Sequence, residues 1–391
     1  MADGPESKQY ADKARATEGE GSVVTLRCGE ALVEVAAGDP STARWLREFV
    51  EPWFAPAAGG RVNARVRLVA SLARFDELDA RQMAAGTHPV PSFSLDSALV
   101  SYPGWSEPDG ATVVADGEYG CFYRVLGKGV EVVAKPGDRM ARIGLLRVVR
   151  EVATLRALTA PGVLDLHAAA FATRDGAVLL IGGKRAGKAT LLAHVLTSGQ
   201  AALLANDRVL VDCSSLLVTG VPTIVPVREE TERRFPALGR GLPRRAALLH
   251  AGEVTSVEVA AMDSGARLVL SPAQFARQLG AASAGSAKLG LIVFPEITED
   301  ESAWSLVPVA REDGNARLLA GLYASRTGPR EPTVFQAAAG ETPIPGTQAA
   351  LALQLAAAVP LVVCRLGPYA YRGHARAWLR ALPLPKEDAR P

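Results

Sequence analysis

Short apolar runs separated by turn residues dominate the first third of the chain. Runs that are apolar throughout, or that alternate with polar residues, are typical of β-strands. They fall at residues 23–26, 31–35, 61–68, 112–115, 121–125 and 130–133. A helical pattern in this part covers residues 41–54, with Ser41 as its candidate capping residue. The pattern predicts a mainly β domain over residues 22–136.

Residues 140–157 carry the clearest helical period of the chain. Apolar residues recur there at the spacing of one helix face, at Ile143, Leu146, Val149 and Leu155. The Ala-Pro-Gly sequence at residues 160–162 then breaks the chain. We therefore place a domain boundary near residue 136 and expect this helix to lead into the second domain.

Apolar runs and helical patterns alternate over the rest of the chain. Strands are predicted at residues 163–171, 177–181, 201–205, 209–211, 289–295 and 360–364. Helices are predicted at residues 191–196, 347–358 and 375–382. Alternation of this kind is typical of proteins in which helices cover a sheet. The predicted fold class is α/β, or α+β with the first part included, and the second domain spans residues 137–391.

Length and charge narrow the classes of protein that fit. With 391 residues the chain is too long for one ordinary core, which agrees with two domains. Lys and Arg number 43 and Asp and Glu 41, which gives a net charge of +2. A general nucleic-acid or membrane-surface binder would carry a strong basic excess. We therefore expect neither a nucleic acid nor a membrane as partner.

The cysteines and the N-terminal segment indicate the compartment. Cys28, Cys121, Cys213 and Cys364 are far apart, so buried thiols in a reducing compartment are expected rather than disulfides or a zinc site. Residues 1–21 are polar, lack the apolar core of a signal peptide, and are expected to form a disordered tail. No run approaches the roughly 20 apolar residues of a membrane span. The expected location is the cytoplasm.

A glycine-rich loop lies between the predicted strand 177–181 and the predicted helix 191–196. It consists of Gly182, Gly183, Lys184, Arg185, Ala186, Gly187, Lys188, Ala189 and Thr190. A strand, a glycine loop ending in lysine, and a helix together form the arrangement that holds a nucleoside triphosphate. Glycines let backbone N–H groups point at phosphate oxygens, and the helix directs its positive end at the same charge. Lys188 would reach the β- and γ-phosphates.

A purely structural turn with solvated cations is the alternative interpretation of this loop. Lys184, Arg185 and Lys188 would repel one another in so short a segment without an anion nearby, which favours phosphate binding. The residue after the lysine usually supplies a hydroxyl that holds Mg²⁺. Here it is Ala189, and the hydroxyl of Thr190 lies one place later. The loop predicts a nucleoside triphosphate as ligand and leaves ATP or GTP open, with Thr190 as a candidate ligand of Mg²⁺.

Two polar residues near strand ends are candidate catalytic groups. Asp207 follows the predicted strand 201–205, where a carboxylate can hold Mg²⁺ or take the proton of an attacking hydroxyl. His167 precedes the loop strand and could orient the phosphate or the acceptor. The alternatives are an Asp that caps a turn and a His packed in a core. Three arginines could supply charge to a transition state or merely form ion pairs on a solvated helix: Arg228, Arg233 and Arg234.

Together these residues resemble the HPr kinase/phosphorylase family, whose P-loop domain is related to that of phosphoenolpyruvate carboxykinase. The resemblance covers about residues 160–235. In that family a strand ending in His, here His167, precedes the loop strand. The family loop reads like G-x-S-G-x-G-K-S, and residues 182–189 stand in its place. The strand after the loop helix ends in two acidic residues, which here are Asn206 and Asp207.

The resemblance implies a P-loop, HPr kinase-like domain that binds ATP and Mg²⁺. It further implies phosphate transfer to a serine hydroxyl on a protein or peptide. Asp207 would act as base and metal ligand, with Lys188 and His167 beside it. Relatives of this type carry different N-terminal domains, and some act on peptide natural-product precursors, so the β domain could recognise the acceptor. The family often forms oligomers, which makes a homo-oligomer an open expectation.

Three departures from the family pattern leave other functions open. Arg185 replaces a loop glycine, Ala189 replaces the hydroxyl that holds Mg²⁺, and Asn206 replaces one of two carboxylates. Thr190 could supply the hydroxyl if the helix begins one residue later. A catalytically degenerate nucleotide-binding scaffold or sensor is therefore one alternative. A kinase of a small hydroxyl metabolite, such as a free amino acid, is another.

Overall fold

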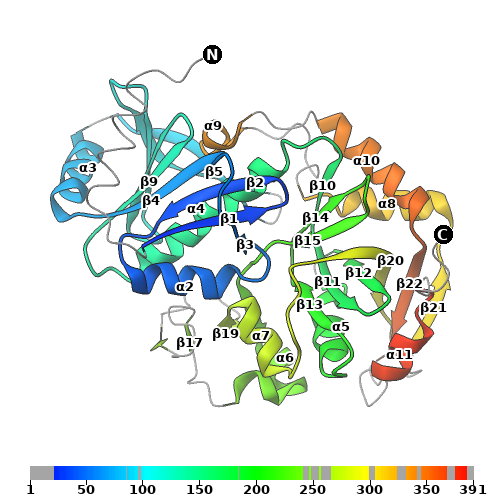
Figure 1. Cartoon of the computed structure of the whole chain (residues 1–391). Coiled ribbons are helices and arrows are strands. Elements are labelled where there is room, and N and C mark those ends of the chain that lie inside the picture. The colour runs from blue at the N-terminus through cyan, green and yellow to red at the C-terminus, as the bar shows by residue number, and fades with distance from the viewer. Residues whose placement is uncertain are drawn as a thin grey trace.

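The computed structural model shows a mixed α/β protein built on two large sheets (Figure 1), so the predicted class is confirmed at this level. It describes residues 22–84, 86–95, 98–183, 185–240, 246–247, 255–256, 266–298, 304–323, 332–340, 345–367 and 375–384. The predicted tail, residues 1–21, lies outside these ranges. The helices are α2 (Pro40–Val50), α3 (Leu72–Ala84), α4 (Met140–Ala157), α5 (Lys188–Leu196), α6 (Glu229–Arg234), η1 (Pro236–Gly239), α7 (Pro272–Gln278), α8 (Arg311–Ala320), α9 (Gln336–Ala339), α10 (Pro345–Ala358) and α11 (Ala375–Ala381).

The first sheet is formed by the N-terminal part of the chain, in the order β3-β1-β2-β4-β9-β8-β7-β6-β5. Its strands are β1 (Val23–Cys28), β2 (Ala31–Ala36), β3 (Ala55–Pro56), β4 (Ala64–Ala70), β5 (His88–Leu95), β6 (Ala98–Ser106), β7 (Thr112–Asp116), β8 (Cys121–Leu126) and β9 (Gly129–Ala134). The pairs β2–β4 and β4–β9 are parallel. Helix α4 packs against β1, β2, β4 and β9, while α3 packs against β8 and β9.

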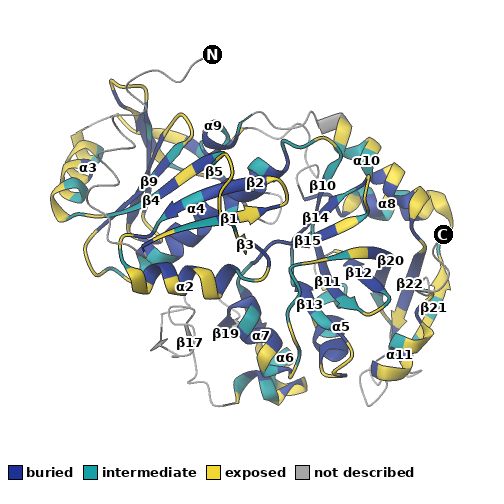
Figure 2. Ribbon diagram, viewed as in Figure 1, coloured by how far each residue is buried: buried dark blue, intermediate teal, exposed yellow. Residues whose placement is uncertain are grey.

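Alternate residues of the first sheet belong to different cores, as the two-residue period of a strand requires. Tyr123 and Val132 belong to the large core that includes α4. Their neighbours Phe122 and Val133 pack with Leu78 of α3 in a separate small cluster. The sheet is therefore covered on both faces. Figure 2 shows its central strands in dark blue and much of α3 in yellow.

Helix α2 is capped by a different residue from the one predicted. The Asp39 carboxylate accepts hydrogen bonds from the backbone N–H groups of Ser41 and Thr42 at 2.9 and 3.0 Å. Pro40 occupies the first helical position, which suits a residue without an N–H group. Ser41 therefore lies inside the helix, and its predicted role as the cap was wrong.

The second sheet has the order β10-β14-β15-β20-β12-β11-β13, with β22 beside β20 and β21 beside β22. Its strands are β10 (Val163–Leu166), β11 (Ala168–Thr173), β12 (Gly176–Ile181), β13 (Ala202–Ala205), β14 (Val209–Asp212), β15 (Leu217–Gly220), β20 (Ser286–Ile297), β21 (Trp304–Pro308) and β22 (Leu361–Leu366). β12, β20 and β22 run parallel. Two short pairs lie outside both sheets: β16 (Val225–Arg228) with β19 (Ala266–Leu270), and β17 (Ala246–Ala247) with β18 (Thr255–Ser256).

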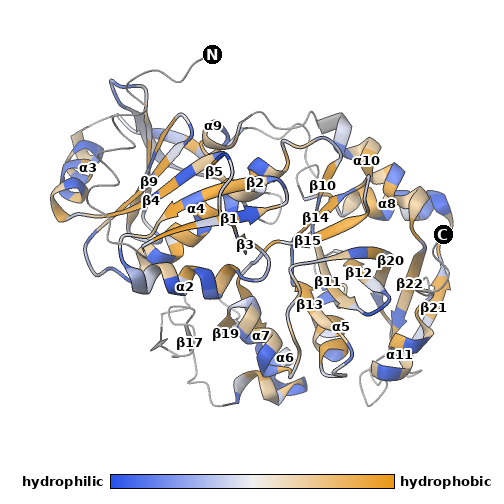
Figure 3. Ribbon diagram, viewed as in Figure 1, coloured by the Kyte–Doolittle hydropathy of each residue, from blue (hydrophilic) through white to orange (hydrophobic). Residues whose placement is uncertain are grey.

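Helices cover both faces of the second sheet. Alternate residues of β12 show this, since Leu179 belongs to the core with α8 and α10, whereas Leu180 belongs to the core with α5 and α11. A strand buried on both faces needs apolar residues at every position, which explains the continuous apolar run at residues 177–181. Figure 3 shows these strands in orange.

The two sheets share contacts across the boundary predicted near residue 136. Helix α4 packs on the first sheet rather than leading away from it. The indole N–H of Trp53 donates to the Leu204 carbonyl oxygen at 2.5 Å. From the C-terminal part, the backbone N–H of Val334 donates to the Pro91 carbonyl oxygen at 2.8 Å. The chain passes from the first sheet to the second after α4, and residues 332–340 lie against the first sheet again.

The cysteines behave as predicted from their spacing. All four are buried free thiols. Burial raises the pKa of Cys28 to about 12 and that of Cys213 and Cys364 to about 11. Across the described part of the chain, no helix has both the length and the apolar character needed to cross a membrane.

Candidate functional site

The strand order of the second sheet brings three separated segments to one edge. β11 lies between β12 and β13 and is antiparallel to both. β12 and β13 therefore run in the same direction and end at the edge where β11 begins. In register, Ala168 faces Ile181 and Ala170 faces Ala205. The segments just beyond these strand ends contain His167, the glycine loop and Asp207, which become neighbours for this reason.

His167 lies at this edge because it separates two strands, β10 and β11. Residues 163–171 were predicted as one strand, which was wrong. β10 ends at Leu166 and pairs with β14, whereas β11 begins at Ala168 and pairs with β12 and β13. The backbone N–H of His167 instead donates to the Gly321 carbonyl oxygen at 2.8 Å. Residues 163–171 are apolar except for Asp165 and His167, and such a run carries no period that could mark the end of one strand and the start of the next.

The glycine loop curls tightly at the start of α5. A Cβ atom on Gly182 would lie 2.9 Å from the Cβ atom of Ala186, so a larger residue would force the loop open. Gly187 precedes α5 with a φ of 95°, in the left-handed region. Arg185, which replaces a family glycine, also has a positive φ, 69°. Lys184 lies outside the described residues.

The first turn of α5 is available to an anion. No side chain caps this end of the helix. The N–H groups of a first helical turn have no partner within the helix and carry its positive dipole end. A glycine loop wrapped before an uncapped helix end is the geometry that binds phosphate.

The ammonium group of Lys188 folds back over the loop. Its Nζ atom donates to the carbonyl oxygens of Gly182 and Gly183 at 2.5 and 3.2 Å. It also lies 3.3 Å from Nε2 of His167. The ammonium group is therefore held inside the curl by neutral carbonyls, and phosphate oxygens in the same place would form stronger, charge-assisted bonds.

His167 links Lys188 to Asp207. Its second ring nitrogen, Nδ1, lies 3.4 Å from Oδ1 of Asp207. A neutral ring suits both neighbours, because Nδ1–H can donate to the carboxylate while Nε2 accepts from the ammonium group. The His167 side chain is 15% exposed and that of Asp207 is 40% exposed. The carboxylate therefore faces the solvent, and the structure brings the three predicted catalytic residues together.

A buried ion pair fixes the residue that follows Asp207. Arg208 donates to both carboxylate oxygens of Asp165 at 2.9 and 2.7 Å, and it lies 3.5 Å from the Glu151 carboxylate on α4. Burial alone would lower the pKa of Arg208, but the Asp165 carboxylate outweighs it, and the pKa is raised above its usual value. A buried ion pair therefore holds the backbone beside Asp207 in place.

Tyr323 packs behind the same group. The Arg208 guanidinium lies 4.0 Å from its ring centroid, and the His167 ring lies 6.3 Å away. Burial raises the pKa of the Tyr323 hydroxyl. The sequence analysis missed Arg208 and Tyr323. Arg208 could have been suspected because it adjoins Asp207, whereas no local signal marks Tyr323.

Asn206 stands where the family pattern has one of two adjacent acidic residues, and its side-chain amide is used for structural hydrogen bonds. Its Oδ1 accepts from the Thr223 hydroxyl at 2.8 Å, and its Nδ2 donates to the Ile224 carbonyl oxygen at 3.3 Å. Both ends of the amide are thus engaged by the segment that follows β15. The arginines considered as charge donors lie farther along the same segment, on β16 and α6: Arg228, Arg233 and Arg234.

The expected metal site has few protein ligands. Thr190 was expected to replace Ala189 as the metal ligand only if the helix began one residue later. α5 begins at Lys188, so this condition is not met. Among the described residues, no three or more His, Cys, Asp or Glu side chains gather in a way that could hold a metal. Mg²⁺ often binds through one or two carboxylates together with phosphate oxygens and water. Asp207 fits that smaller role.

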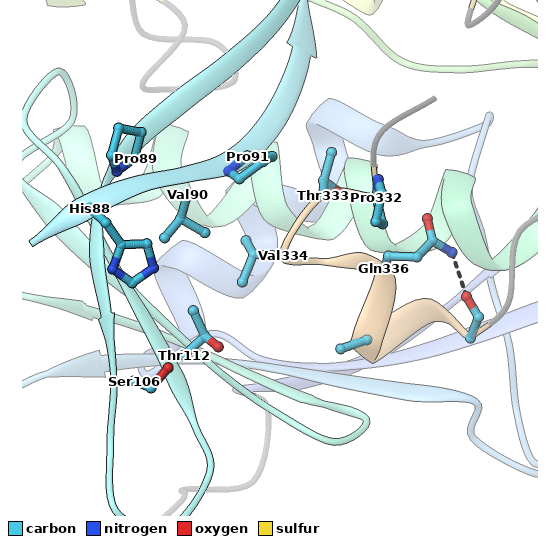
Figure 4. A pocket seen from close by; sticks show the side chains of 12 residues that line it. His88, Pro89, Val90, Pro91, Ser106, Thr112, Pro332, Thr333, Val334 and Gln336 are labelled. Atoms are coloured by element: carbon cyan, nitrogen blue, oxygen red, sulfur yellow. Dashed lines mark hydrogen bonds between the residues drawn. The ribbon is translucent and has the colours of Figure 1, made fainter. Parts of the chain in front are cut away.

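A separate cavity of about 710 Å³ lies at the edge of the first sheet (Figure 4). It opens between β5 and the returning segment 332–340, and it is away from the glycine loop. The Thr333 side chain is buried, and its hydroxyl has no hydrogen-bond partner among the residues described. The cavity is lined by His88, Pro89, Val90, Pro91, Ser106, Thr112, Pro332, Thr333, Val334, Gln336, Ala337 and Gly340.

The chain was compared with protein-family models and with curated proteins. No protein-family model matches the chain, and no curated protein matches it.

Proposed function

We propose that the chain is an ATP-dependent kinase of the HPr kinase type that phosphorylates a serine hydroxyl on a protein or peptide. The observation that carries the proposal is the group Lys188, His167 and Asp207, joined by separations of 3.3 and 3.4 Å beside the glycine loop. The group sets a cation, an imidazole ring and a carboxylate between the glycine loop and the solvent. Phosphoryl transfer needs charge stabilisation at the phosphate and a base at the acceptor.

The loop and α5 would hold the triphosphate of ATP. Backbone N–H groups of the first turn of α5 would face the phosphates, and Lys188 would exchange its contacts with the Gly182 and Gly183 carbonyl oxygens for β- and γ-phosphate oxygens. Mg²⁺, with Asp207 as a protein ligand, would supply further neutralisation of the phosphate charge. Arg185 is exposed within the loop and adds a cation there.

Asp207 would receive the acceptor from the solvent side. Its carboxylate takes the proton of the serine hydroxyl as the oxygen attacks the γ-phosphorus. The bond from the γ-phosphorus to the β–γ bridging oxygen breaks, and ADP leaves with that oxygen. Lys188 stabilises the charge on the phosphate oxygens during the transfer.

His167 would keep the Lys188 ammonium group and the Asp207 carboxylate apart. If the ring were absent, the ammonium group of Lys188 and the carboxylate of Asp207 could pair directly, and the carboxylate would become a weaker base. The ring instead donates to one and accepts from the other. Its burial against Tyr323 holds it in that orientation. His167 is therefore proposed as a residue that positions both catalytic groups.

The first sheet is proposed to recognise the acceptor. It contains the cavity beside β5, which combines apolar walls with hydroxyl and imidazole groups. Such a mixture suits a peptide segment better than a phosphate or a nucleic acid. A kinase that uses ATP in this way would work in the cytoplasm, and it could act as a homo-oligomer, as related families do.

A non-catalytic nucleotide-binding scaffold or sensor is the second candidate. Two observations favour it: exposed Ala189 cannot supply the usual metal-binding hydroxyl, and the Asn206 amide is fully engaged by Thr223 and Ile224. Such a protein would bind ATP almost independently of Mg²⁺ and would not turn it over.

Phosphate transfer tests these candidates directly. The protein is incubated with γ-labelled ATP and Mg²⁺, together with a library of serine-containing peptides or with free serine, and products are identified by mass spectrometry. Phosphopeptides support the proposed function, whereas phosphoserine formed without any peptide supports a small-metabolite kinase. ATP binding without release or transfer of phosphate would exclude both kinases in favour of the scaffold.

A further inference from the structure

A three-residue segment directly after α8 lies beside the candidate site. It consists of Gly321, Leu322 and Tyr323, since α8 ends at Ala320. The site itself is built from three other parts of the chain, which are the turn before β11, the glycine loop after β12 and the residues after β13. The segment contacts each of these parts, either directly or through the residue next to it.

Backbone hydrogen bonds join this segment to the turn before β11. The N–H group of His167 donates to the Gly321 carbonyl oxygen at 2.8 Å, and the N–H group of Tyr323 donates to the Asp165 carbonyl oxygen at 3.1 Å. An antiparallel β-bridge lies between these two bonds. The segment therefore runs beside the end of β10 as a short strand, and it holds the backbone at the point where His167 separates β10 from β11.

Gly321 packs against the strand that leads into the glycine loop. A Cβ atom on Gly321 would lie 2.5 Å from Cγ2 of Ile181, which is the last residue of β12. The φ of Gly321 is −85°, a value that any residue adopts, so the contact rather than the backbone conformation requires glycine here. Because Gly182 directly follows Ile181, the segment is held at a fixed place relative to the start of the loop.

The ring of Tyr323 packs against side chains from two parts of the site. Its centroid lies 4.0 Å from the Arg208 guanidinium and 6.3 Å from the ring centroid of His167. Both distances are within the range of favourable cation–π and aromatic contacts. Arg208 directly follows Asp207, and the His167 ring lies 3.4 Å from the Asp207 carboxylate. One buried ring therefore contacts both residues that determine where this carboxylate lies.

The three proposed catalytic side chains need support of this kind. His167 and Asp207 lie beyond the ends of their strands, so the ladder hydrogen bonds of the sheet do not hold them. The separations that join the group are 3.3 Å from Lys188 to His167 and 3.4 Å from His167 to Asp207. Strong charge-assisted hydrogen bonds are shorter, at about 2.7–2.9 Å. The contacts within the group are therefore too weak to fix its geometry by themselves.

We infer that Tyr323 is a positioning residue for phosphoryl transfer, and that its ring keeps His167 and the Asp207–Arg208 backbone at a fixed spacing. The inference rests on the proposed function, and it adds a residue that does not touch the substrate. With the spacing held, the Asp207 carboxylate stays turned to the solvent, where an acceptor would arrive, and away from the Lys188 ammonium group. The ring acts on the base rather than on the phosphate loop, so its loss should affect transfer more than nucleotide binding.

Transfer kinetics and nucleotide binding provide the first test. Transfer of the γ-phosphate to a serine peptide, and calorimetric binding of a non-hydrolysable ATP analogue, are measured for the wild type, Tyr323→Leu and Tyr323→Phe. Tyr323→Leu removes the flat ring, so kcat should fall about 10- to 100-fold, because a misplaced catalytic group costs rate. Its affinity for the ATP analogue should stay within about threefold of the wild type. Tyr323→Phe keeps the ring and should restore kcat to within about threefold.

Tyr119→Leu is the matched control. Tyr119 is 7% exposed, compared with 8% for Tyr323, and its ring lies 5.3 Å from the buried Arg147 guanidinium beside the first sheet. The same change is thus made at an equally buried tyrosine that also packs on an arginine. Both leucine variants should lower the unfolding temperature, whereas only Tyr323→Leu should lower kcat.

Crystal structures of the wild type and Tyr323→Leu give a readout that does not need activity. In the variant, the separation of His167 from Lys188 or from Asp207 should increase. Unchanged separations, or a kcat of Tyr323→Leu within about threefold of the wild type, would overturn the inference. An equal loss of kcat in Tyr323→Phe would also overturn it, because the hydroxyl rather than the ring would then be responsible. So would a parallel loss of ATP-analogue binding in Tyr323→Leu, which would indicate a general collapse of the site.

The two proposals can fail separately. If the wild type transfers phosphate to no acceptor, the kinase proposal fails, whereas the separations in the two crystal structures still decide whether Tyr323 positions His167 and Asp207. If the wild type is an active kinase and Tyr323→Leu transfers at the wild-type rate, only the role of Tyr323 fails.

Discussion

Arg208 and Asp165 form a bidentate ion pair, in which Nε and Nη2 of Arg208 donate to the two carboxylate oxygens at 2.9 and 2.7 Å. Each residue is only 2% exposed. The pair joins the residue after Asp207 to β10, the strand that ends just before His167. One interaction therefore ties together the two segments whose side chains meet in the site. Both charges have been taken out of water, so their stability depends on each other.

Removing one partner of this pair should destabilise the fold strongly. Asp165→Asn leaves the Arg208 guanidinium with Glu151 at 3.5 Å as its remaining ion-pair partner among the described residues. Breaking a buried pair typically costs about 3–5 kcal/mol of unfolding free energy. Urea unfolding monitored by circular dichroism measures the loss. Glu34→Gln breaks the exposed pair with Arg65 and serves as control, with a loss of at most about 1 kcal/mol. Similar small losses in both variants would contradict the supporting role.

The capping residue of α2 gives a paired comparison. Asp39→Ala should cost about 1 kcal/mol at neutral pH, whereas Ser41→Ala should cost little. Burial alone would raise the pKa of Asp39, but hydrogen bonds from Thr42 and Ser41 outweigh it and lower the pKa to about 2. The contribution is therefore complete above about pH 4 and is lost as the pH falls towards 2. The unfolding free energies of the wild type and Asp39→Ala, measured across this pH range, should converge as the pH falls. A loss of stability in Ser41→Ala equal to that in Asp39→Ala would contradict the assignment of Asp39 as the cap.

Asp207→Asn should separate binding from transfer. The amide cannot accept the proton of the acceptor, so transfer should fall by at least about 100-fold. Binding of the ATP analogue should stay within about threefold, because the loop and Lys188 are unchanged. Asp212→Asn, at the end of β14, is the matched control and should keep activity. Transfer at the wild-type rate in Asp207→Asn would exclude the residue as the base.

Ala189→Ser restores the hydroxyl that phosphate loops usually supply to Mg²⁺. Ala189 is exposed in the first turn of α5, so the change should be tolerated by the fold. If the site uses Mg²⁺ through few protein ligands, the serine should lower the Mg²⁺ concentration needed for half-maximal ATP hydrolysis or binding. Magnesium titrations of the two proteins measure this shift. An unchanged titration would show that no metal approaches this helix end.

Local patterns in the sequence predicted the elements that local interactions determine. The helix at residues 140–157 was assigned with its observed bounds because its apolar positions follow a regular period. The strand, glycine loop and helix around Lys188 were assigned because each segment has its own composition. Their meeting with His167 and Asp207 was expected through the family resemblance, and the antiparallel position of β11 now gives its physical cause.

Long-range relationships were beyond the reach of sequence patterns. Nothing near Trp53 signals its hydrogen bond to the Leu204 carbonyl oxygen. The change of strand at His167 was missed because the residues beside it are nearly all apolar and show no period. In each case the deciding partner lies on another element, far away in the sequence.

The most direct test of the account is calorimetric binding of a non-hydrolysable ATP analogue to the wild type and to Lys188→Ala, with and without Mg²⁺. The account predicts binding to the wild type that is strengthened by Mg²⁺, and no measurable binding to Lys188→Ala. Lys128→Ala, which removes an exposed lysine from the first sheet, is the control and should bind as the wild type does. Failure of the wild type to bind, or equal binding by Lys188→Ala, would contradict the account and leave the glycine loop as a structural turn.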